Sequence, residues 1–450
     1  MKVAKFGGTS LATADQIRKV CNIVVSDPDR KIIVVSAPGK RYKDDIKVTD
    51  LLIACAERCL ADGSAEPELE AIVSRYREIA QQLNVSDKIV ELIAADLKGR
   101  LSADKSNREK FIDSLKAAGE DNCAKLVAAY LQGIGVEAQY VNPKDAGLLL
   151  SNEFGNAQVL PESYEKLKCL KNRPGIIIFP GFFGCSPEGD VVTFPRGGSD
   201  ITGSILAAAV EADLYENFTD VDSVYAVDPR IVANPKPIHE ITYREMRELS
   251  YAGFSVLHEE ALVPVYYKGI PVRIKNTNNP DAPGTTIRRT RENTNGPVVG
   301  IACDTGFCSI FMSKYLMNRE VGFGRKVLQI LENEGIAYEH LPSGIDNMSV
   351  VLRENKLTKD IEERIIQRIK EELKVDDIHV ERDLALVVIV GEGMMRTVGI
   401  TARAGAAFAR ARVNIEMINQ GSSEVSIMFG VRAEDSVNAV RALYEEFFEK

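Results

Sequence analysis

The sequence predicts an α/β protein with a largely parallel sheet, followed by a duplicated smaller unit. Short β-branched runs alternate with amphipathic helical segments in the first part of the chain, which is typical of βαβ units. Glycine-rich turns lie between a strand and a helix at two places. In the C-terminal third, the same order of elements occurs twice with an offset of 77 residues, which separates Gly322 from Gly399 and Glu339 from Glu416. A constant offset of this kind indicates an internal repeat.

Length and composition restrict the class of protein. The 450 residues predict about three domains, and 45% hydrophobic with 27% charged residues is the mixture of an ordinary globular chain. No apolar run approaches the roughly 20 residues of a membrane helix, and the N-terminus lacks the pattern of a secretory signal. A net charge of −9 argues against a nucleic-acid-binding surface. The eight dispersed cysteines form no CxxC pair, so we expect a cytoplasmic protein without disulfides or a zinc site.

The first part of the chain supplies the elements of the predicted sheet. Strands are expected at 3–6, 31–36 and 176–179, where β-branched or apolar residues cluster. Helices are expected at 13–26, where apolar residues recur at helical spacing, and at 204–210, which is rich in alanine and leucine. The stretch from about 66 to 132 has no strand signal, and we interpret it as a helical insertion.

The second part of the chain begins after a segment rich in Asn, Pro and Gly at 276–296, which we interpret as a linker. The first copy of the repeat is predicted as strand 309–314, helix 321–334, strands 336–340 and 348–352, and helix 358–373. The second copy is predicted as strand 386–390, helix 398–411, strands 413–417 and 425–429, and helix 435–448. Only the first copy is followed by a further strand, at 378–381. We infer that strand 298–302 supplies the missing strand of the second copy, so that the first copy is inserted in the second.

The turn KFGGTS, residues 5–10, follows the first strand and precedes the first helix. Small residues let backbone N–H groups approach phosphate oxygens, and a helix N-terminus adds partial positive charge. Lys5 can add a compact cation. The spacing is not that of a P-loop. The alternative is a tight turn in which Ser10 or Thr13 caps a helix.

The turn RGGSD, residues 196–200, is the second glycine-rich turn directly before a helix. Ligands of parallel α/β sheets bind at such strand ends. Asp200 can bind an ammonium group or a metal, and Arg196 a carboxylate. The alternative is that Ser199 or Asp200 only caps the helix. A third segment, 219–230, could bind a base and ribose, but by itself it also fits ordinary turns.

Taken together, these segments resemble the aspartokinase family. The resemblance rests on KFGGTS, PRGGSD, TDVDSVYAVDPR, ELSYAGFSVLH and IKNTNNPDAPGTTI, which occur in the family's order over nearly the whole chain. It implies an amino-acid-kinase (carbamate-kinase-like) domain, a three-layer α/β/α sandwich, over residues 1–290. It also implies two ferredoxin-like βαββαβ ACT domains, the first over 307–383 and the second over 297–304 plus 384–450.

The resemblance implies an ATP-dependent kinase that phosphorylates the β-carboxylate of L-aspartate to 4-phospho-L-aspartate. This is the first step toward lysine, threonine, methionine and diaminopimelate. The cofactor would be ATP with Mg²⁺ that is held mainly by phosphates, without a side-chain metal site. A carboxylate nucleophile is ionised at pH 7 and needs no general base, so catalysis reduces to alignment and charge neutralisation. We expect a monofunctional enzyme, because the chain has no room for a homoserine dehydrogenase domain.

The resemblance also implies roles for individual residues. The catalytic group would comprise Lys5, Gly7, Gly8, Arg196 and Asp200. Aspartate would be bound by Ser10, Thr49, Glu120, Phe182, Arg196, Gly198 and Ser199. ATP would be bound by Lys5, Gly8, Thr219, Asp220, Tyr225, Arg230 and Ser255.

Two positions depart from the family's pattern. Ser255 stands where the family usually has a lysine in GAKVLH, and Lys275 could compensate for that missing cation. Pro195 replaces a common glycine, which we expect to change little. His258 is interpreted as a structural histidine rather than a base.

The implied regulatory site lies in the first ACT copy. Its candidate residues are Met317, Arg319, Gly322, Phe323, Glu339, Ser343 and Gly344. Glu339 is the expected partner of an effector ammonium group, so lysine is favoured as inhibitor, alone or with threonine. In the second copy, Glu416, Gly399 and Gly421 are expected to have a structural role only. We expect at least a homodimer through the ACT domains, with a dimer of dimers as the larger alternative.

Two other functions remain open from the sequence. One is a kinase of the same fold that acts on glutamate or acetylglutamate, against which the paired ACT units argue. The other is a non-catalytic amino-acid sensor, for which Ser255 is the only support. We expect the protein to bind neither nucleic acid nor a membrane.

Overall fold

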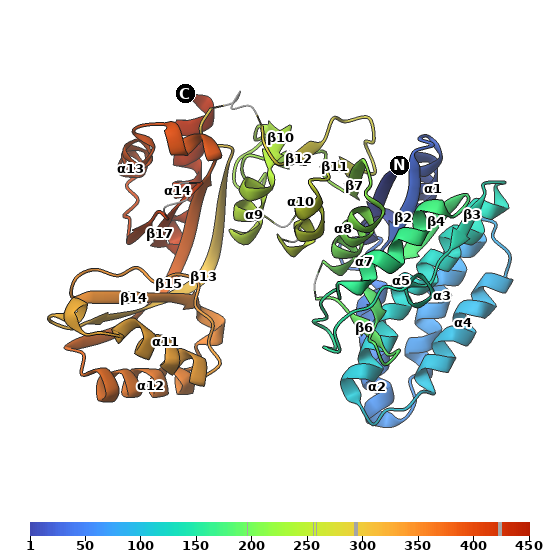
Figure 1. The fold of residues 1–450 in the computed structure, drawn as a ribbon, viewed down its shortest axis with the longest axis horizontal. Coiled ribbons are helices and arrows are strands. Elements are labelled where there is room, and N and C mark those ends of the chain that lie inside the picture. The colour runs from blue at the N-terminus through green and yellow to red at the C-terminus, as the bar shows by residue number, and fades with distance from the viewer. Residues whose placement is uncertain (196, 255, 258, 292–295, 422–424) are drawn as a thin grey trace. The chain divides into compact units, whose positions relative to one another are not determined.

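The computed structural model describes the chain except for residues 196, 255, 258, 292–295 and 422–424. It divides into two compact units, shown in Figure 1. The first comprises Met1–Val224, Pro237–Ser250 and Ser255–Arg291, and the second comprises Tyr225–Lys236, Tyr251–Phe254 and Glu292–Lys450. Within the described residues, no helix is both long and apolar enough to cross a membrane.

The first unit is built on an eight-stranded sheet in the order β10-β12-β11-β7-β1-β2-β4-β3. All neighbouring pairs are parallel except β11 with β12, which confirms the predicted, largely parallel sheet. Successive residues of the central strands are buried, so both faces of the sheet are covered. The strands are β1 (Lys2–Phe6), β2 (Arg30–Val35), β3 (Ala138–Tyr140), β4 (Ile176–Pro180), β7 (Leu214–Thr219), β10 (Glu240–Thr242), β11 (Val272–Asn276) and β12 (Thr285–Arg288).

Two groups of helices pack against this sheet. Helix α5 packs on β2, β3 and β4 with α1 beside it, and α8 packs on β1, β2 and β7 with α7 and α10 beside it. Helix α1 begins as predicted, with the Thr13 hydroxyl accepting a hydrogen bond from the backbone N–H of Gln16. The helices are α1 (Ala14–Val25), α2 (Val48–Asp62), α3 (Glu66–Gln82), α4 (Lys88–Leu101), α5 (Arg108–Gly133), α6 (Pro143–Ala146), α7 (Glu162–Leu167), α8 (Gly198–Val210), α9 (Tyr243–Tyr251) and α10 (Val263–Lys268).

The segment 66–132 is helical, as predicted. Helices α3, α4 and α5 run through it, and Figure 1 shows them packed side by side with α2. Their apolar faces meet in one core that is continuous with the core under the sheet and includes Leu69, Tyr76, Ile93 and Leu115. These helices therefore belong to the body of the first unit.

The prediction of a linker over 276–296 is wrong in part. Residues Thr285–Arg288 form β12, which pairs with β11 and β10 in the main sheet. Thr285 and Ile287 are buried on one face of this strand. Thr285, Thr286 and Ile287 are β-branched and favour a strand. The many Asn, Pro and Gly residues around them made the segment as a whole resemble a linker.

The second unit contains a five-stranded antiparallel sheet in the order β14-β13-β15-β17-β16. Four helices accompany it at the predicted places: α11 (Phe323–Asn333), α12 (Lys359–Arg368), α13 (Ile400–Arg410) and α14 (Ser436–Tyr444). The strands are β13 (Gly300–Ser313), β14 (Asn347–Arg353), β15 (Asp377–Val390), β16 (Met417–Asn419) and β17 (Ser426–Arg432).

Two long strands connect the copies of the repeat. Strand β13 joins the separate strands predicted at 298–302 and 309–314, and β15 joins those predicted at 378–381 and 386–390. Gly300–Thr305 pairs with 385–390, whereas Ser309–Ser313 pairs with 377–381. One sheet therefore serves both copies.

The predicted strand at 336–340 is not formed. His340 makes only an isolated bridge with Val351. Pro342 has no N–H for a ladder, so the pairing with β14 continues only as single contacts: the N–H of Ser349 donates to the Pro342 carbonyl at 2.8 Å, and Ser343 forms an isolated bridge with Met348. The corresponding strand of the second copy is short and lies at Met417–Asn419 rather than 413–417.

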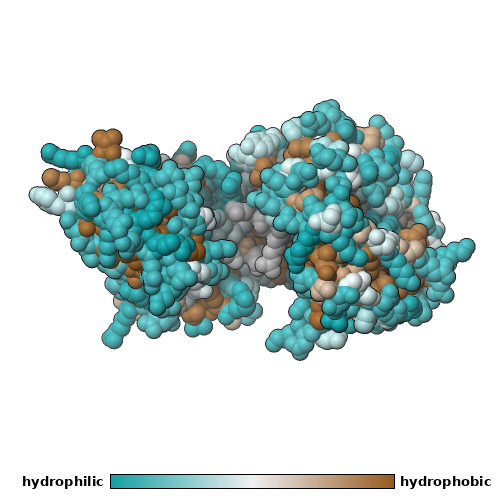
Figure 2. Space-filling view, turned by 90° about the horizontal axis from the view of Figure 1, so that it is seen from below, coloured by the Kyte–Doolittle hydropathy of each residue, from teal (hydrophilic) through white to brown (hydrophobic). Residues whose placement is uncertain are grey.

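The face of the molecule in Figure 2 is mostly hydrophilic, with hydrophobic residues in small separate groups. The exposed hydrophobic residues of the second unit include Val321 and Val398, which are 95% and 100% exposed. They occupy equivalent positions in the two copies, directly before the glycines that precede α11 and α13.

Candidate active site

The turn after β1 is held against the loop after β2. The backbone N–H of Gly7 donates to the Phe218 carbonyl at 3.1 Å, and that of Gly39 donates to the Gly8 carbonyl at 2.8 Å. A Cβ atom on Gly39 would lie 2.5 Å from the carbonyl carbon of Gly8. Only glycine permits this approach, which brings the ends of two neighbouring parallel strands together.

The second predicted turn leads directly into α8. Gly197 has a left-handed conformation, with φ of +84°, and the helix begins at Gly198. Phe182 is held beside it in a left-handed conformation, its N–H donating to the Thr202 hydroxyl at 3.0 Å. The N-terminal end of α8, with its partial positive charge, thus lies next to the Phe182 turn.

Lys5 and Asp200 link the two turns. Their side chains form an ion pair of 2.5 Å, and both are largely buried. The Asp200 carboxylate also accepts a hydrogen bond from the Asn217 side chain at 2.8 Å. Because Lys5 and Asn217 are register partners on β1 and β7, the sheet itself fixes the direction of the ammonium group.

Glu120 provides a buried carboxyl group on helix α5. Burial raises its pKa to about 8, and this effect outweighs the lowering by hydrogen bonds to backbone N–H groups and by the Lys47 charge. Its Oε2 atom has no hydrogen-bond partner among the described residues. A cation placed beside it would lower the pKa and gain a strong partner.

A cavity of about 350 Å³ brings these groups together. Nine predicted residues line it: Lys5, Gly7, Gly8, Thr49, Glu120, Phe182, Gly198, Ser199 and Asp200. They come from β1, α2, α5 and α8 and from the loop after β4, so distant segments of the sequence form one site.

Several lining residues were not predicted, among them Ser36, Lys47, Lys116 and Gly155. Lys47 is half-exposed and lies 3.5 Å from Asp50, and Lys116 lies 3.4 Å from Asp113. Lys116 precedes Glu120 by one helical turn, a spacing that could have pointed to it. Both lysines add positive charge to a site whose predicted cation, Lys5, already pairs with Asp200.

Other predicted residues lie elsewhere. Ser10 is buried, its hydroxyl 2.7 Å from that of Thr277, and it does not line the cavity. The Ser10 side chain is therefore buried against Thr277, and the cavity wall does not include it. Thr219 and Asp220 lie at the end of β7, where the Thr219 carbonyl accepts a hydrogen bond from the N–H of Thr277.

The remaining nucleotide candidates are divided between the units. Tyr225 and Arg230 belong to the second unit, where Arg230 is 88% exposed and forms an ion pair of 2.6 Å with Asp228. The ammonium of Lys275 donates to the Ala282 carbonyl at 2.5 Å, and burial lowers its pKa. Predicted residues Arg196, Ser255 and His258 lie outside the described part of the chain.

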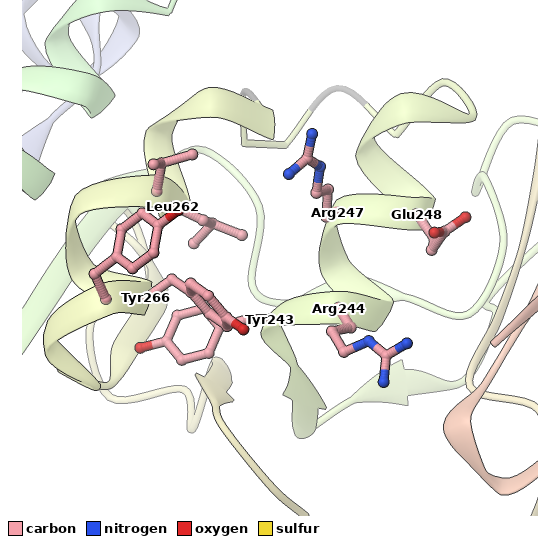
Figure 3. Close-up of a pocket in the computed structure, with 8 residues that line it drawn as sticks. Tyr243, Arg244, Arg247, Glu248, Leu262 and Tyr266 are labelled. Atoms are coloured by element: carbon pink, nitrogen blue, oxygen red, sulfur yellow. The ribbon is translucent and has the colours of Figure 1, made fainter. Parts of the chain in front are cut away.

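A second cavity of about 500 Å³ lies between α9 and α10 and is shown in Figure 3. It is larger, but none of the predicted site residues in the described part of the chain lines it. We place the chemistry in the smaller cavity because that one combines a glycine turn, a helix N-terminus, cations and a buried carboxyl group. The residues of the larger cavity are Tyr243, Arg244, Arg247, Glu248, Leu262, Val263, Tyr266 and Tyr267.

Of the predicted effector residues, Met317, Arg319, Gly322 and Phe323 lie directly before or at the start of α11. Gly322, with φ of +82°, precedes the helix, and Met317 and Phe323 are buried beside it. Arg319, Ser343 and Gly344 are exposed. Glu339 already has partners, because Arg353 lies 3.5 Å away and the Tyr251 hydroxyl donates to its carboxylate. An effector ammonium group would have to compete with them.

Comparison with known proteins places the chain in a family. The amino acid kinase family matches residues 1–276, and an ACT domain family matches 387–447. Aspartokinase 3 of Bacillus subtilis is 63% identical over 448 residues, which cover 100% of this chain and 99% of that protein. Aspartokinase 1 of Arabidopsis thaliana chloroplasts is 29% identical, over 99% of this chain and 80% of that protein.

Solved structures agree with the sequence relatives. The aspartate kinase of Clostridium acetobutylicum superimposes with a TM-score of 0.88 at 41% identity, over 99% of this chain and 100% of that chain. E. coli aspartokinase III with aspartate and ADP, in its R-state, gives 0.81 at 27% identity, with both chains covered fully. The same enzyme with lysine and aspartate, in its T-state, gives 0.76 at 26% identity, over 100% of this chain and 99% of that one. Near-complete coverage by family, sequence and fold shows that this chain is a member of the aspartokinase family.

Proposed function

We propose that the 350 Å³ cavity catalyses transfer of the γ-phosphoryl group of ATP to the β-carboxylate of L-aspartate, which gives 4-phospho-L-aspartate. The observation that carries this proposal is the meeting of Lys5, the Gly7-Gly8 turn and the α8 N-terminus around one cavity that Glu120 also lines. Positive groups on one wall suit a phosphoryl group in transfer, and an acidic group suits the ammonium of an amino acid. The related E. coli enzyme was solved with aspartate and ADP.

The proposed mechanism requires little covalent chemistry from the protein. The β-carboxylate of aspartate attacks the γ-phosphorus as its P–O bond to the β-phosphate breaks, and ADP leaves with that bond's electron pair. Lys5 would turn from Asp200 toward the transferring group and balance its charge. Backbone N–H groups of Gly8 and of the first turn of α8 would add further stabilisation.

Aspartate recognition is proposed to divide among the other walls. The Glu120 carboxyl would lose its proton as it accepts the substrate ammonium group, because the entering cation lowers its pKa. Arg196 would bind the α-carboxylate, with Thr49, Phe182 and Ser199 lining the pocket. Lys47 and Lys116 extend the positive wall and support a doubly anionic substrate.

ATP is proposed to lie along the ends of β1 and β7. Thr219 and Asp220 stand at the end of β7, next to the strand that carries Lys5. Tyr225 and Arg230 would contact the base and ribose. Ser255 would take the place of the family's lysine, and Lys275 stays a candidate for the compensating cation.

Magnesium would accompany ATP and supply positive charge between the phosphates. The described residues hold no group of three or more His, Cys, Asp or Glu side chains placed to bind a metal. The cavity does offer the Asp200 carboxylate, which fits an ion held mainly by phosphates with one protein oxygen.

Replacing Lys5 tests the proposed activity. Lys5→Met should reduce turnover of aspartate with ATP by roughly 10³-fold, because transition-state charge loses its closest cation. The measurement is a coupled ADP-release assay with aspartate, glutamate and acetylglutamate, with circular dichroism as a check of folding. Lys2→Met, which loses a pair with Asp27 at the other end of the same strand, is the matched control.

Three results would contradict the proposal. Retained turnover in a folded Lys5→Met protein would remove the role of Lys5. Preference for glutamate or acetylglutamate would point to another kinase of this fold, and no turnover with any substrate would favour an amino-acid sensor.

We further propose feedback inhibition at the first ACT copy, with lysine as effector, alone or with threonine. The acidic Glu339 of the first copy supports a ligand with a side-chain ammonium group, which would displace the Arg353 and Tyr251 side chains from its carboxylate. E. coli aspartokinase III was solved with lysine in its T-state. The domain boundaries of 1–290, 307–383, and 297–304 plus 384–450 are part of this proposal. The pairing of 300–305 with 385–390 supports the split second ACT domain, whereas the second compact unit also takes in Tyr225–Lys236 and Tyr251–Phe254.

A homodimer through the ACT domains is part of the same proposal. Val321 and Val398 expose apolar surface at equivalent helix starts. In the first copy, Tyr315 is 76% exposed, and Ile345, whose carbonyl accepts a hydrogen bond from the N–H of Asn318, is 69% exposed. Light scattering should give at least twice the 49.5 kDa chain mass. Val321→Asp should shift the species toward the monomer, whereas a purely monomeric wild-type protein would refute it. We place the protein in the cytoplasm, which suits its eight unpaired cysteines.

A further inference from the structure

Arginine 75 lies outside the cavity but reaches the loop that carries part of it. It belongs to α3, the first helix of the segment 66–132. Its side chain is 4% exposed, and its guanidinium occupies the inside of the loop 38–48. The ends of that loop meet, because the N–H of Val48 donates to the Pro38 carbonyl at 3.0 Å.

The guanidinium of Arg75 contacts both arms of this loop. Nη2 donates to the Gly39 carbonyl at 2.5 Å, and Nη1 donates to the Ile46 carbonyl at 3.3 Å. Nη1 also pairs with the Asp45 carboxylate at 2.9 Å. A rigid planar fork that binds two carbonyls and a carboxylate determines the spacing between them.

A second arginine completes the arrangement around Asp45. Arg41 donates to both oxygens of this carboxylate through its side chain and also through its backbone N–H at 2.8 Å. It reaches Glu78 on α3 at 3.1 Å. Asp45 is 7% exposed, and its hydrogen bond with Arg41 lowers its pKa far below the usual value, so the group stays charged at neutral pH.

The loop connects this cluster to the cavity at two points. Gly39 donates its N–H to the Gly8 carbonyl and touches the Gly8 backbone, so it supports the glycine turn beside Lys5. At the other end, Lys47 and Thr49 line the cavity. Any change in the spacing of Gly39 and Ile46 therefore moves both the turn and the wall.

Stability alone does not account for a buried arginine here. Burial lowers the pKa of Arg75 and so opposes its charge, and an apolar side chain of similar volume often fills such a place at no loss of stability. An apolar side chain would, however, leave the two carbonyl groups without a common partner. The charged guanidinium of Arg75 therefore contributes mainly by orienting the loop 38–48.

We propose that Arg75 is a positioning residue for the phosphoryl transfer, which it serves by holding the loop 38–48 against the Gly8 turn. This inference rests on the proposed function. It gives α3 a part in catalysis without any contact between that helix and a substrate.

Four variants test the inference in the full-length protein, and one of them, Arg75→Ala, leaves space for an added guanidinium ion. Arg75→Met removes the fork, Arg75→Lys keeps one charge but cannot reach both carbonyls, and Arg77→Met is the control. Arg77 lies on the same helix, is 41% exposed and pairs only with Glu70 in the described structure. Initial rates are measured with aspartate and ATP varied separately, together with thermal unfolding and hydrogen exchange of amides 39–48.

We expect kcat/KM for aspartate to fall at least tenfold in Arg75→Met, to fall less in Arg75→Lys, and to stay unchanged in Arg77→Met. Amides 39–48 should exchange faster in both Arg75 variants. Methylguanidinium added at millimolar concentration should restore part of the activity of Arg75→Ala, which a loss of folding would not permit.

Wild-type kinetics and exchange in Arg75→Lys would overturn the inference, even if Arg75→Met fails to fold. A lower melting temperature with unchanged kinetics in Arg75→Met would also overturn it, since it would show a role in stability only. If the wild-type protein does not phosphorylate aspartate, the proposed function fails. The exchange of amides 39–48 then still decides whether Arg75 holds the loop.

Discussion

The carboxyl group of residue 120 lies fully buried in helix α5, where its pKa rises to about 8. In the unfolded chain the same group ionises near pH 4.5. As the pH rises from 4.5 to 8, the unfolded state loses a proton that the folded state keeps, so Glu120 lowers the free energy of unfolding across this range. A group that costs stability and lines the proposed active cavity is a candidate for function.

Glu120→Gln should therefore separate stability from activity. We expect the variant to gain thermal stability relative to the wild type at pH 8 and to gain little at pH 4.5, because the pH-dependent penalty disappears. The KM for aspartate should rise by roughly tenfold or more, since an amide cannot pair with the ammonium as a carboxylate does. Calorimetry at the two pH values and initial rates check these outcomes. An unchanged KM would contradict the role in substrate binding.

Among the elements, the glycine turn after β1 depends on the loop after β2. The 2.5 Å distance from a Cβ on Gly39 to the Gly8 backbone leaves no room for any side chain. The motif KFGGTS predicts the turn. The sequence around Gly39, in contrast, does not indicate that the turn packs against Gly39. That contact arises because β1 and β2 are parallel neighbours.

Gly39→Ala should displace the Gly8 turn. We expect kcat to fall roughly tenfold or more, because Lys5 and the Gly8 N–H lose their relative alignment. Gly99→Ala is the matched control, since no atom lies within 4 Å of its Cβ position in α4. That change should leave activity intact and stabilise the helix by up to about 1 kcal/mol. Equal kinetics of the two variants would show that the close approach is unimportant.

For the molecule as a whole, the net charge of −9 opposes the binding of anionic substrates. Two anionic substrates must bind to an acidic chain, so cations must be concentrated at the site. Lys5, Lys47 and Lys116 line the 350 Å³ cavity that Glu120 also lines. A cationic effector is attracted by negative charge instead, and the carboxylate of Glu339 can supply it.

Regulation at this scale is tested with lysine. Glu339→Gln should weaken lysine inhibition by roughly tenfold and leave the uninhibited rate largely unchanged, because Glu339 lies in the second unit. By reciprocity, aspartate and ATP should weaken lysine binding. Calorimetric titration with and without substrates measures this coupling, and Glu416→Gln is the control. Equal lysine affinity in both titrations would contradict the proposed coupling.

The sequence by itself determined the local elements and the family. Most of the predicted strands and helices follow from apolar periodicity, and the 77-residue repeat follows from the constant offset between its glycine and glutamate positions. The motifs and the family resemblance pointed to nine of the described lining residues. Only the tertiary structure decided how these pieces meet. Long strands β13 and β15 run through what looked like separate strands, and 285–288 joins the sheet across a stretch that looked like a linker. Packing of the helices brings Lys47 and Lys116 to the cavity and Arg75 to the loop 38–48 behind it. Apart from the spacing of Lys116 and Glu120 on one helix, such contacts depend on which segments become neighbours in space, and the local pattern of one chain does not contain that information.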